Sequence, residues 1–113
     1  MDHSPNPLPV EKAASTFAAL GSEQRLSVLR TLVRAGPDGL TIGILGKRSG
    51  ITGSTLTHHM KILSAAGLVS QVRAGRQIIC IAADYSEMQA LAAYLLSECC
   101  ADVEDQSEGH NNG

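Results

Sequence analysis

Two adjacent cysteines, Cys99 and Cys100, carry the side chains with the clearest potential for chemistry. Neighbouring Cα atoms are about 3.8 Å apart, which is closer than the roughly 4.4–6.8 Å found in disulfides, so we expect a free dithiol. Soft thiolates suit thiophilic ions, and trivalent arsenic or antimony is a better partner for them than Mg²⁺ or Ca²⁺. The pair therefore predicts a metalloid site. The alternative is that Cys99 is a small buried hydrophobic residue and Cys100 is incidental.

The third cysteine, Cys80, alternates with Ile79 and Ile81 in an apolar run, which is typical of a structural residue in a strand. It is the only other thiol that could complete a three-thiolate site, and we do not expect it to do so. An odd number of cysteines argues against a disulfide framework, and the first residues lack the basic flank and apolar stretch of a secretory signal. We therefore expect a cytoplasmic protein with free thiols.

A second group of residues suits recognition of DNA. Placed about 100° apart, Leu56, Met60 and Leu63 share one face of a helix, and short polar or basic side chains occupy the other face. Such side chains let a helix approach the major groove and hydrogen-bond to base edges, and nearby Lys and Arg can neutralise phosphates. His59 borders the apolar face, so we expect it to pack or to bond a carbonyl group. The predicted DNA-binding residues are Ser54, Thr55, Thr57, His58, Lys61, Lys47, Arg48, Arg73 and Arg76.

The distribution of charge supports a polyanionic partner although the net charge is −2. Residues 21–83 contain eight Lys or Arg against two acidic residues, a local charge of +6, whereas residues 84–113 contain seven acidic residues and no Lys or Arg. A basic block followed by an acidic segment can hold a polyanion with its middle while the C-terminal part faces elsewhere. A solvated basic surface without a partner is the alternative on charge alone.

The elements that must position these residues follow from apolar periodicity and capping signals. We expect stripes of buried residues on the first, second and last helices: Val10, Ala13, Ala14, Phe17 and Leu20; Leu26, Leu29, Leu32 and Val33; Met88, Leu91, Ala92, Leu95 and Leu96. Thr41 and Thr52 are the expected caps of the third and fourth helices. The pattern predicts helices over 10–20, 23–34, 42–48 and 53–66, strands over 68–72 and 77–82, and a helix over 85–100.

This order, α-α-α-α-β-β-α, predicts a mainly α winged helix-turn-helix with a β-hairpin wing. Residues 10–100 form its single domain, and the turn at 73–76 is the tip of the wing. The prolines in residues 1–9 predict a flexible arm, and the polar residues 101–113 predict a disordered acidic tail. No apolar run approaches the roughly 20 residues that span a bilayer.

Several segments together resemble the ArsR/SmtB family of bacterial winged-helix repressors. They are the second-helix opening Ala19-Leu20-Gly21-Ser22-Glu23-Gln24-Arg25-Leu26, the recognition helix Ile51-Thr52-Gly53-Ser54-Thr55-Leu56-Thr57-His58-His59-Met60-Lys61-Ile62-Leu63, the turn Ala66-Gly67-Leu68-Val69 and the wing tip Arg73-Ala74-Gly75-Arg76. The resemblance covers roughly residues 10–100. It implies a homodimer through the first and last helices, operator binding without ligand, and release on binding a metal, metalloid or other signal. The dimerisation residues that it implies are Phe17, Met88, Leu91 and Leu95.

Departures from the family's patterns narrow the effector that the resemblance implies. Some members carry a cysteine motif for metal on the helix before the recognition helix, but residues 41–45 contain no cysteine. Zinc sensors of the family use aspartate and histidine on the last helix, which contains no histidine here. We therefore expect neither of these two metal sites. The pair Cys99 and Cys100 resembles that of arsenic-responsive members. Many members carry glutamine where Gly53 stands, so one base contact is absent.

Three functions are compatible with these residues. The first is a dimeric, non-enzymatic repressor released from DNA by organoarsenite, arsenite or antimonite at Cys99 and Cys100, with no cofactor besides this effector. Because only two thiols are close in sequence, we expect organoarsenite, which has two positions left for thiolates, to be favoured. The second is a redox or reactive-sulfur sensor of the same fold. The third, a thiol-dependent arsenate reductase, is disfavoured because Glu98 and Asp102 would oppose both a thiolate and an oxyanion.

Overall fold

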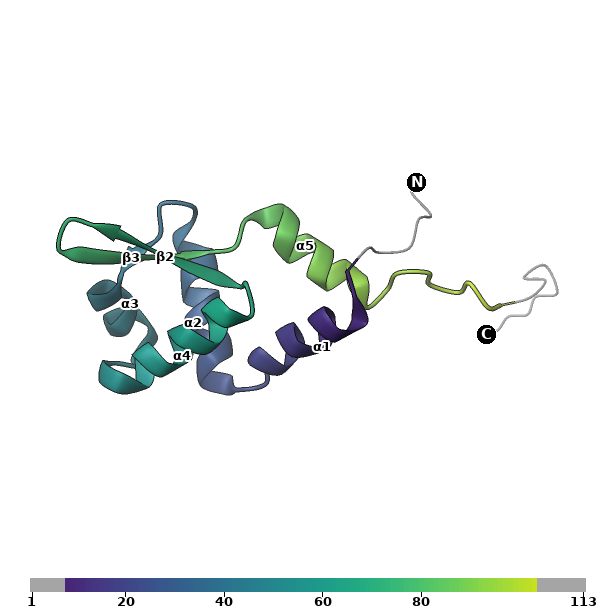
Figure 1. The fold of residues 1–113 in the computed structure, drawn as a ribbon, viewed down its shortest axis with the longest axis horizontal. Coiled ribbons are helices and arrows are strands. Elements are labelled where there is room, and N and C mark those ends of the chain that lie inside the picture. The colour runs from purple at the N-terminus through teal and green to yellow at the C-terminus, as the bar shows by residue number, and fades with distance from the viewer. Residues whose placement is uncertain (1–7, 104–113) are drawn as a thin grey trace.

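The computed structural model describes residues 8–103, and the predicted arm and acidic tail lie almost wholly outside this range. Its elements confirm the predicted mainly α winged helix-turn-helix and add one short strand, β1 (Figure 1). They are α1 (Val10–Ala19), α2 (Glu23–Ala35), β1 (Leu40–Thr41), α3 (Ile42–Ser49), α4 (Gly53–Ala65), β2 (Val69–Ala74), β3 (Gln77–Ala82) and α5 (Tyr85–Tyr94).

The core lies where α2, α3 and α4 pack against the sheet. Burial of these apolar side chains supplies most of the free energy that holds the helices together, about 1.5–3 kcal/mol for each fully buried large side chain. The largest fully buried side chains are Leu32, Leu45, Met60, Leu63, Val28 and Cys80.

The faces of two helices differ in part from the expected stripes. On α2, Leu29 and Leu32 are buried as predicted, but Val28 is the third buried residue, and Leu26 and Val33 are each 44% exposed. On α1 the buried residues are Ala13, Thr16 and Ala19, whereas Val10 and Ala14 are exposed. Thr16 can be buried because its hydroxyl donates to the Lys12 carbonyl oxygen at 2.8 Å.

The sheet is antiparallel with the order β1-β3-β2. Ala74 pairs with Gln77, so the turn of the wing contains only Gly75 and Arg76, and Arg73 lies in strand β2 opposite Ile78. The predicted four-residue turn was therefore two residues too long. A strand as short as β1 has no periodicity of its own, and only its pairing with β3 defines it.

Helix α5 ends at Tyr94, six residues before the predicted end at Cys100, and residues 95–102 continue as a series of turns. Leu91 is the only buried residue of α5, and the predicted stripe beyond it is open to solvent: Ala92 is exposed, Leu95 is 69% exposed and Leu96 is 71% exposed. Without packing, a short helical extension is marginal. Acidic residues after Tyr94 also oppose the negative end of the helix dipole.

The fold is elongated, and two of its regions lie at opposite ends (Figure 1). The wing, α3 and the first turns of α4 lie at one end, and α1, α5 and the segment after α5 lie at the other. No helix within residues 8–103 is both long enough and apolar enough to cross a membrane.

Candidate functional site

The two helices of the helix-turn-helix, α3 and α4, are held by a tight turn. Thr41 caps α3 as predicted, because its hydroxyl accepts a hydrogen bond from the Ile44 backbone N–H at 3.2 Å. Thr52 occupies the N-cap position of α4 but its side chain makes no capping hydrogen bond. Gly53 opens α4 with φ +65°. This conformation favours glycine, which is a local reason for glycine where many ArsR/SmtB members carry glutamine.

Helix α4 has the two faces that the sequence predicts. Its inward face consists of Leu56, His59, Met60 and Leu63. The predicted DNA-binding residues of α4 lie together on its exposed face: Ser54, Thr55, Thr57, His58 and Lys61. The Thr57 hydroxyl donates to the Gly53 carbonyl oxygen at 3.3 Å, which leaves its oxygen free to accept from a donor outside the protein.

His59 connects α4 to α2. It is 7% exposed, and its Nε2 lies 2.9 Å from the side-chain oxygen Oε1 of Gln24. The expectation that it packs and bonds a carbonyl group is confirmed, and the carbonyl belongs to a side-chain amide. Nδ1 of His59 is buried without a hydrogen-bond partner. Burial, followed by the charges of Arg25 and His58, lowers the pKa of His59 from its ordinary value of 6.5.

The basic residues predicted to meet phosphates are all exposed, and none forms an ion pair with a described residue: Lys47, Arg48, Lys61, Arg73 and Arg76. Lys47 and Arg48 occupy the last turn of α3, and Arg76 is in the turn of the wing. The wing, α3 and the N-terminal end of α4 extend toward the same end of the molecule (Figure 1). Arg25, in contrast, is used internally, because its Nε donates to the Ala19 carbonyl oxygen at 2.6 Å.

Cys99 and Cys100 are brought together by the turns that follow α5. Both side chains are exposed, and their Sγ atoms lie 3.5 Å apart, well beyond the roughly 2.05 Å of a disulfide bond. Glu98 and Cys100 have φ of 60° and 65°, a left-handed conformation that is uncommon for residues other than glycine. The prediction of a helix over 85–100, which would include the pair, was therefore wrong after Tyr94.

Cys99 affects the ionisation of Cys100. The hydrogen bond with Cys99, together with the repulsion between two neighbouring thiolates, raises the pKa of Cys100. Residues 8–103 contain no cluster of three or more His, Cys, Asp or Glu that could hold a metal ion. The pair is thus a two-donor site within the described part of the chain.

Cys80 lies far from this pair. It is 0% exposed in the central strand β3, between Leu40 of β1 and Gln71 of β2, and burial raises the pKa of its thiol. Strand β3 and the segment after α5 are at opposite ends of the fold (Figure 1). The interpretation of Cys80 as structural is consistent with this burial.

The four residues that the family resemblance assigned to a dimer interface have different surroundings. Leu91 is 8% exposed and belongs to the chain's own core, against which the half-buried Phe17 and Met88 pack. Leu95 is 69% exposed. Of the four, Leu95 has by far the most apolar surface available to another molecule.

The sequence did not indicate that Gln24 is the hydrogen-bond partner of His59. Its position in the first turn of α2 has no special pattern, and its role is visible only because α2 and α4 bring it to His59. A polar residue on the border of an apolar face, such as His59, is the signal that a partner of this kind exists.

Comparison with known proteins relates this fold to transcriptional regulators. Residues 20–72 match a family model described as a helix-turn-helix domain. The chain is 31% identical to the nodulation protein NolR of Rhizobium meliloti over 114 aligned positions, covering 96% of this chain and 89% of that protein.

Solved structures share the architecture. An ArsR-like transcriptional regulator from Rhodococcus superposes with a TM-score of 0.66 at 28% identity, over 87% of this chain and 88% of that one. A fragment of a possible ArsR-family regulator from Mycobacterium bovis, described as a homodimeric winged helix-turn-helix DNA-binding domain, superposes with a TM-score of 0.62 at 19% identity, over 91% of this chain and 90% of that one. Both proteins are described as established or possible regulators of transcription.

Proposed function

Because the chain belongs to the ArsR/SmtB family of winged-helix DNA-binding transcriptional regulators, we propose that it is a homodimeric repressor released from its operator by trivalent arsenic or antimony at Cys99 and Cys100. The observation that carries this proposal is the exposed dithiol, with Sγ atoms 3.5 Å apart. Two thiolates in contact can bind one thiophilic atom without rearranging the chain around them.

The exposed face of α4 supports specific binding to the operator. Its short hydroxyl side chains and His58 can exchange hydrogen bonds with base edges in the major groove. The basic residues of α3 and the wing supply attraction to phosphates, and they extend toward the same end of the molecule as α4 (Figure 1). We assign base contacts to Ser54, Thr55, Thr57 and His58, and phosphate contacts to Lys47, Arg48, Lys61, Arg73 and Arg76.

At the end of the fold opposite the wing, exposed apolar side chains favour binding to a second copy of the chain. Val10 of α1 is 61% exposed, and Leu95 and Leu96 after α5 are 69% and 71% exposed. Apolar groups gathered at one end of a protein favour association. A two-fold dimer through α1 and α5 would present two recognition helices to half-sites about 34–36 Å apart.

Arsenic binding at the dithiol needs no oxidant or reductant. For each thiol an S–As bond forms, an As–O bond of the arsenite breaks, and the thiol proton leaves with the hydroxide as water. An organoarsenite has two such hydroxides, which matches the two donors of Cys99 and Cys100. Inorganic arsenite would keep a third position for hydroxide or a small thiol, so we propose that it binds more weakly.

The proposal is tested by release of a labelled operator. Methyl- or phenylarsenite should release the wild type at lower concentration than arsenite, in buffer free of other thiols. The Cys99→Ser, Cys100→Ser double variant should bind the operator as the wild type does and stay bound. Cys80→Ala is the matched control, which keeps the pair and should still be released. Release of the double variant by arsenite would contradict the assignment. Three sulfur ligands in X-ray absorption would mean that Cys80 or a thiol of the partner subunit also binds the arsenic.

Redox or reactive-sulfur sensing, in which Cys99 or Cys100 pairs with another thiol, is the second candidate, and the exposure of both side chains favours it. A peroxide would take two electrons and two protons from the thiols, giving a disulfide and water. Mass measurement of the peroxide- or sulfide-treated protein identifies a disulfide or added sulfur. If such treatment releases the operator and arsenite does not, this candidate replaces the first.

A further inference from the structure

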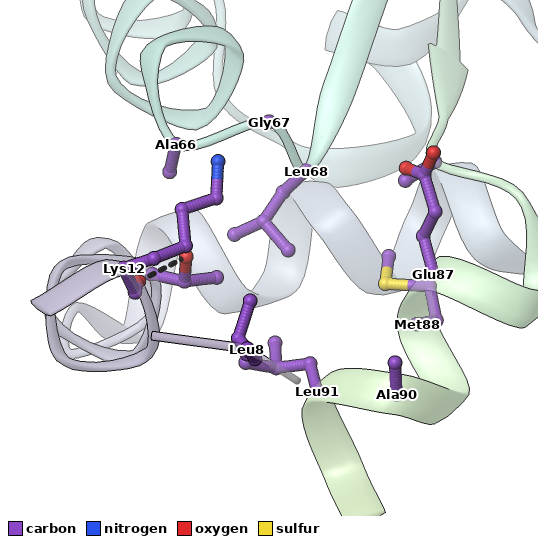
Figure 2. A pocket seen from close by; sticks show the side chains of 11 residues that line it. Leu8, Lys12, Ala66, Gly67, Leu68, Glu87, Met88, Ala90 and Leu91 are labelled. Carbon is purple, nitrogen blue, oxygen red and sulfur yellow. Dashed lines mark hydrogen bonds between the residues drawn. The ribbon is translucent and has the colours of Figure 1, made fainter. Parts of the chain in front are cut away.

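A cavity of about 350 Å³ lies between α1, α5 and the turn that follows α4 (Figure 2). This volume is at the lower end of the roughly 300–1,000 Å³ of small-molecule sites. Helix α1 and Leu8, two residues before it, line one wall and α5 lines another. Ala66, Gly67 and Leu68 close the third side. The cavity has no part in the dithiol or in the predicted DNA surface.

The lining is apolar except for Lys12, Glu87 and Thr16, whose hydroxyl donates to the Lys12 carbonyl oxygen. Leu8, Leu68 and Leu91 form the interior together with Met88. Figure 2 shows the Lys12 amino group reaching toward Ala66 and Gly67, and Glu87 on the other side of Leu68.

The ammonium group of Lys12 is placed next to the end of the recognition helix. Its Nζ lies 3.5 Å from the position that a Cβ would take on Gly67. Neither Lys12 nor Glu87 forms an ion pair with any residue between 8 and 103. The cavity therefore combines an apolar interior with one cation that has no counter-ion in the described chain.

We propose that this cavity binds a small monocarboxylic acid with an apolar body. Its carboxylate pairs with Lys12 beside Gly67, and its apolar part displaces water from Leu8, Leu68 and Leu91. Because Lys12 is exposed, its attraction to the carboxylate is that of a surface ion pair, and the apolar walls hold the body of the ligand. Glu87 repels a second carboxylate, so the site selects monocarboxylates over dicarboxylates.

A ligand in this place would act on DNA binding, and this step alone rests on the proposed function. The cavity touches α1 and α5, the proposed dimer helices, and the turn that ends α4. A bound acid would fix the distance between α1 and the end of α4. Linkage requires that the acid change operator affinity by the same factor as the operator changes affinity for the acid.

Binding is tested without DNA by NMR of methionine methyl groups in the full chain. Octanoate should shift the methyl resonance of Met88, which lines the cavity, and leave that of Met60, which is fully buried in the core. Octanol serves as the matched neutral ligand and octanedioate as the matched dicarboxylate. Lys12→Met should weaken octanoate binding up to about fivefold, the loss of one exposed ion pair, and leave octanol binding unchanged. Glu87→Gln should restore part of the octanedioate affinity.

Several outcomes would overturn the proposal. One is a Met88 resonance that octanoate does not move. Another is equal weakening of octanoate and octanol by Lys12→Met, which would mean that Lys12 only supports the fold. A third is a Met88 resonance that octanoate moves only at protein concentrations where the chain is monomeric, because a second copy then fills the cavity in the dimer. The Cys99→Ser, Cys100→Ser variant should respond to octanoate as the wild type does, so failure of arsenic sensing and failure of this site are separable.

Discussion

His59 lies on the recognition helix, yet its imidazole is directed into the protein, where Nε2 meets Gln24 Oε1 at 2.9 Å. Since the amide oxygen of Gln24 can only accept, Nε2 carries the proton and Nδ1 is the unprotonated nitrogen. Protonation would place a second N–H, without a partner, in a buried site near Arg25 and His58. The hydrogen bond thus fixes both the tautomer of His59 and the contact of α4 with α2.

The first prediction concerns pH. Because the folded pKa of His59 is lowered from 6.5, the unfolded chain binds the proton more readily, and its contribution to stability is complete above about pH 6.5 and is lost as pH falls toward the lower folded pKa. Urea unfolding of the wild type and of His59→Gln should therefore differ in pH slope below about pH 6.5. An unchanged slope in His59→Gln would show that His59 is not the group responsible.

The second prediction separates base contacts from phosphate contacts. Thr57→Ala and His58→Ala should each weaken operator binding by about 1–3 kcal/mol and affect binding to random DNA much less, as loss of a base contact does. Arg76→Ala should weaken both and lower the salt slope by about one. Titrations of both DNAs at several salt concentrations measure this. Equal effects of all three substitutions on both DNAs would remove the assignment of roles.

At the scale of the element, α3 is a short helix with two glycines in very different surroundings. Gly43 is exposed, and a Cβ built on it meets nothing within 4 Å. Gly46 is buried, and a Cβ there would lie 3.1 Å from Cγ2 of Thr52 and 3.3 Å from the Ile51 carbonyl oxygen. The turn between α3 and α4 can approach α3 this closely because residue 46 has no side chain.

The third prediction uses these glycines as a matched pair. Gly43→Ala should stabilise the protein by about 0.5–1 kcal/mol, because alanine loses less backbone entropy in a helix. Gly46→Ala should destabilise it by about 1 kcal/mol, since the turn has to move away. Thermal or urea unfolding measures both. Equal stabilisation by the two substitutions would show that the approach at Gly46 is not tight.

At the scale of the whole molecule, the basic, polar end and the apolar end are separated along the fold (Figure 1). In the proposed function, one end binds DNA and the other binds a second copy. The dithiol is part of the apolar end, directly after Leu95 and Leu96. An effector bound there can alter the proposed interface, and a coupling of about 1–3 kcal/mol is typical of such linkage.

The fourth prediction tests this end. Leu95→Glu should shift the chain from dimer to monomer and weaken operator binding, because a carboxylate would be buried in an apolar interface. Val72→Glu, which places the same charge on an exposed apolar residue of the wing (49% exposed), should leave the dimer intact. Sedimentation velocity measures the oligomeric state. A dimeric Leu95→Glu variant would mean that the interface lies elsewhere.

The sequence by itself determined the helix-turn-helix and its exposed face. The apolar period of residues 53–65 puts Ser54, Thr57 and His58 outward whatever surrounds the helix, and the capping hydroxyl of Thr41 acts within one turn of its own chain. Such features depend on residues a few positions apart, so local physical chemistry is sufficient to predict them.

Only the tertiary structure decided the features that depend on distant contacts. Strand β1 exists because β3 lies beside it, His59 meets Gln24 across 35 positions of sequence, and Leu91 is buried by its own chain. Helix α5 ends at Tyr94 because the apolar residues directly after it, Leu95 and Leu96, are not buried. The turns that follow bring Cys99 and Cys100 together. Periodicity in sequence shows that a face is apolar, but the free energy of burial depends on whether another surface covers that face.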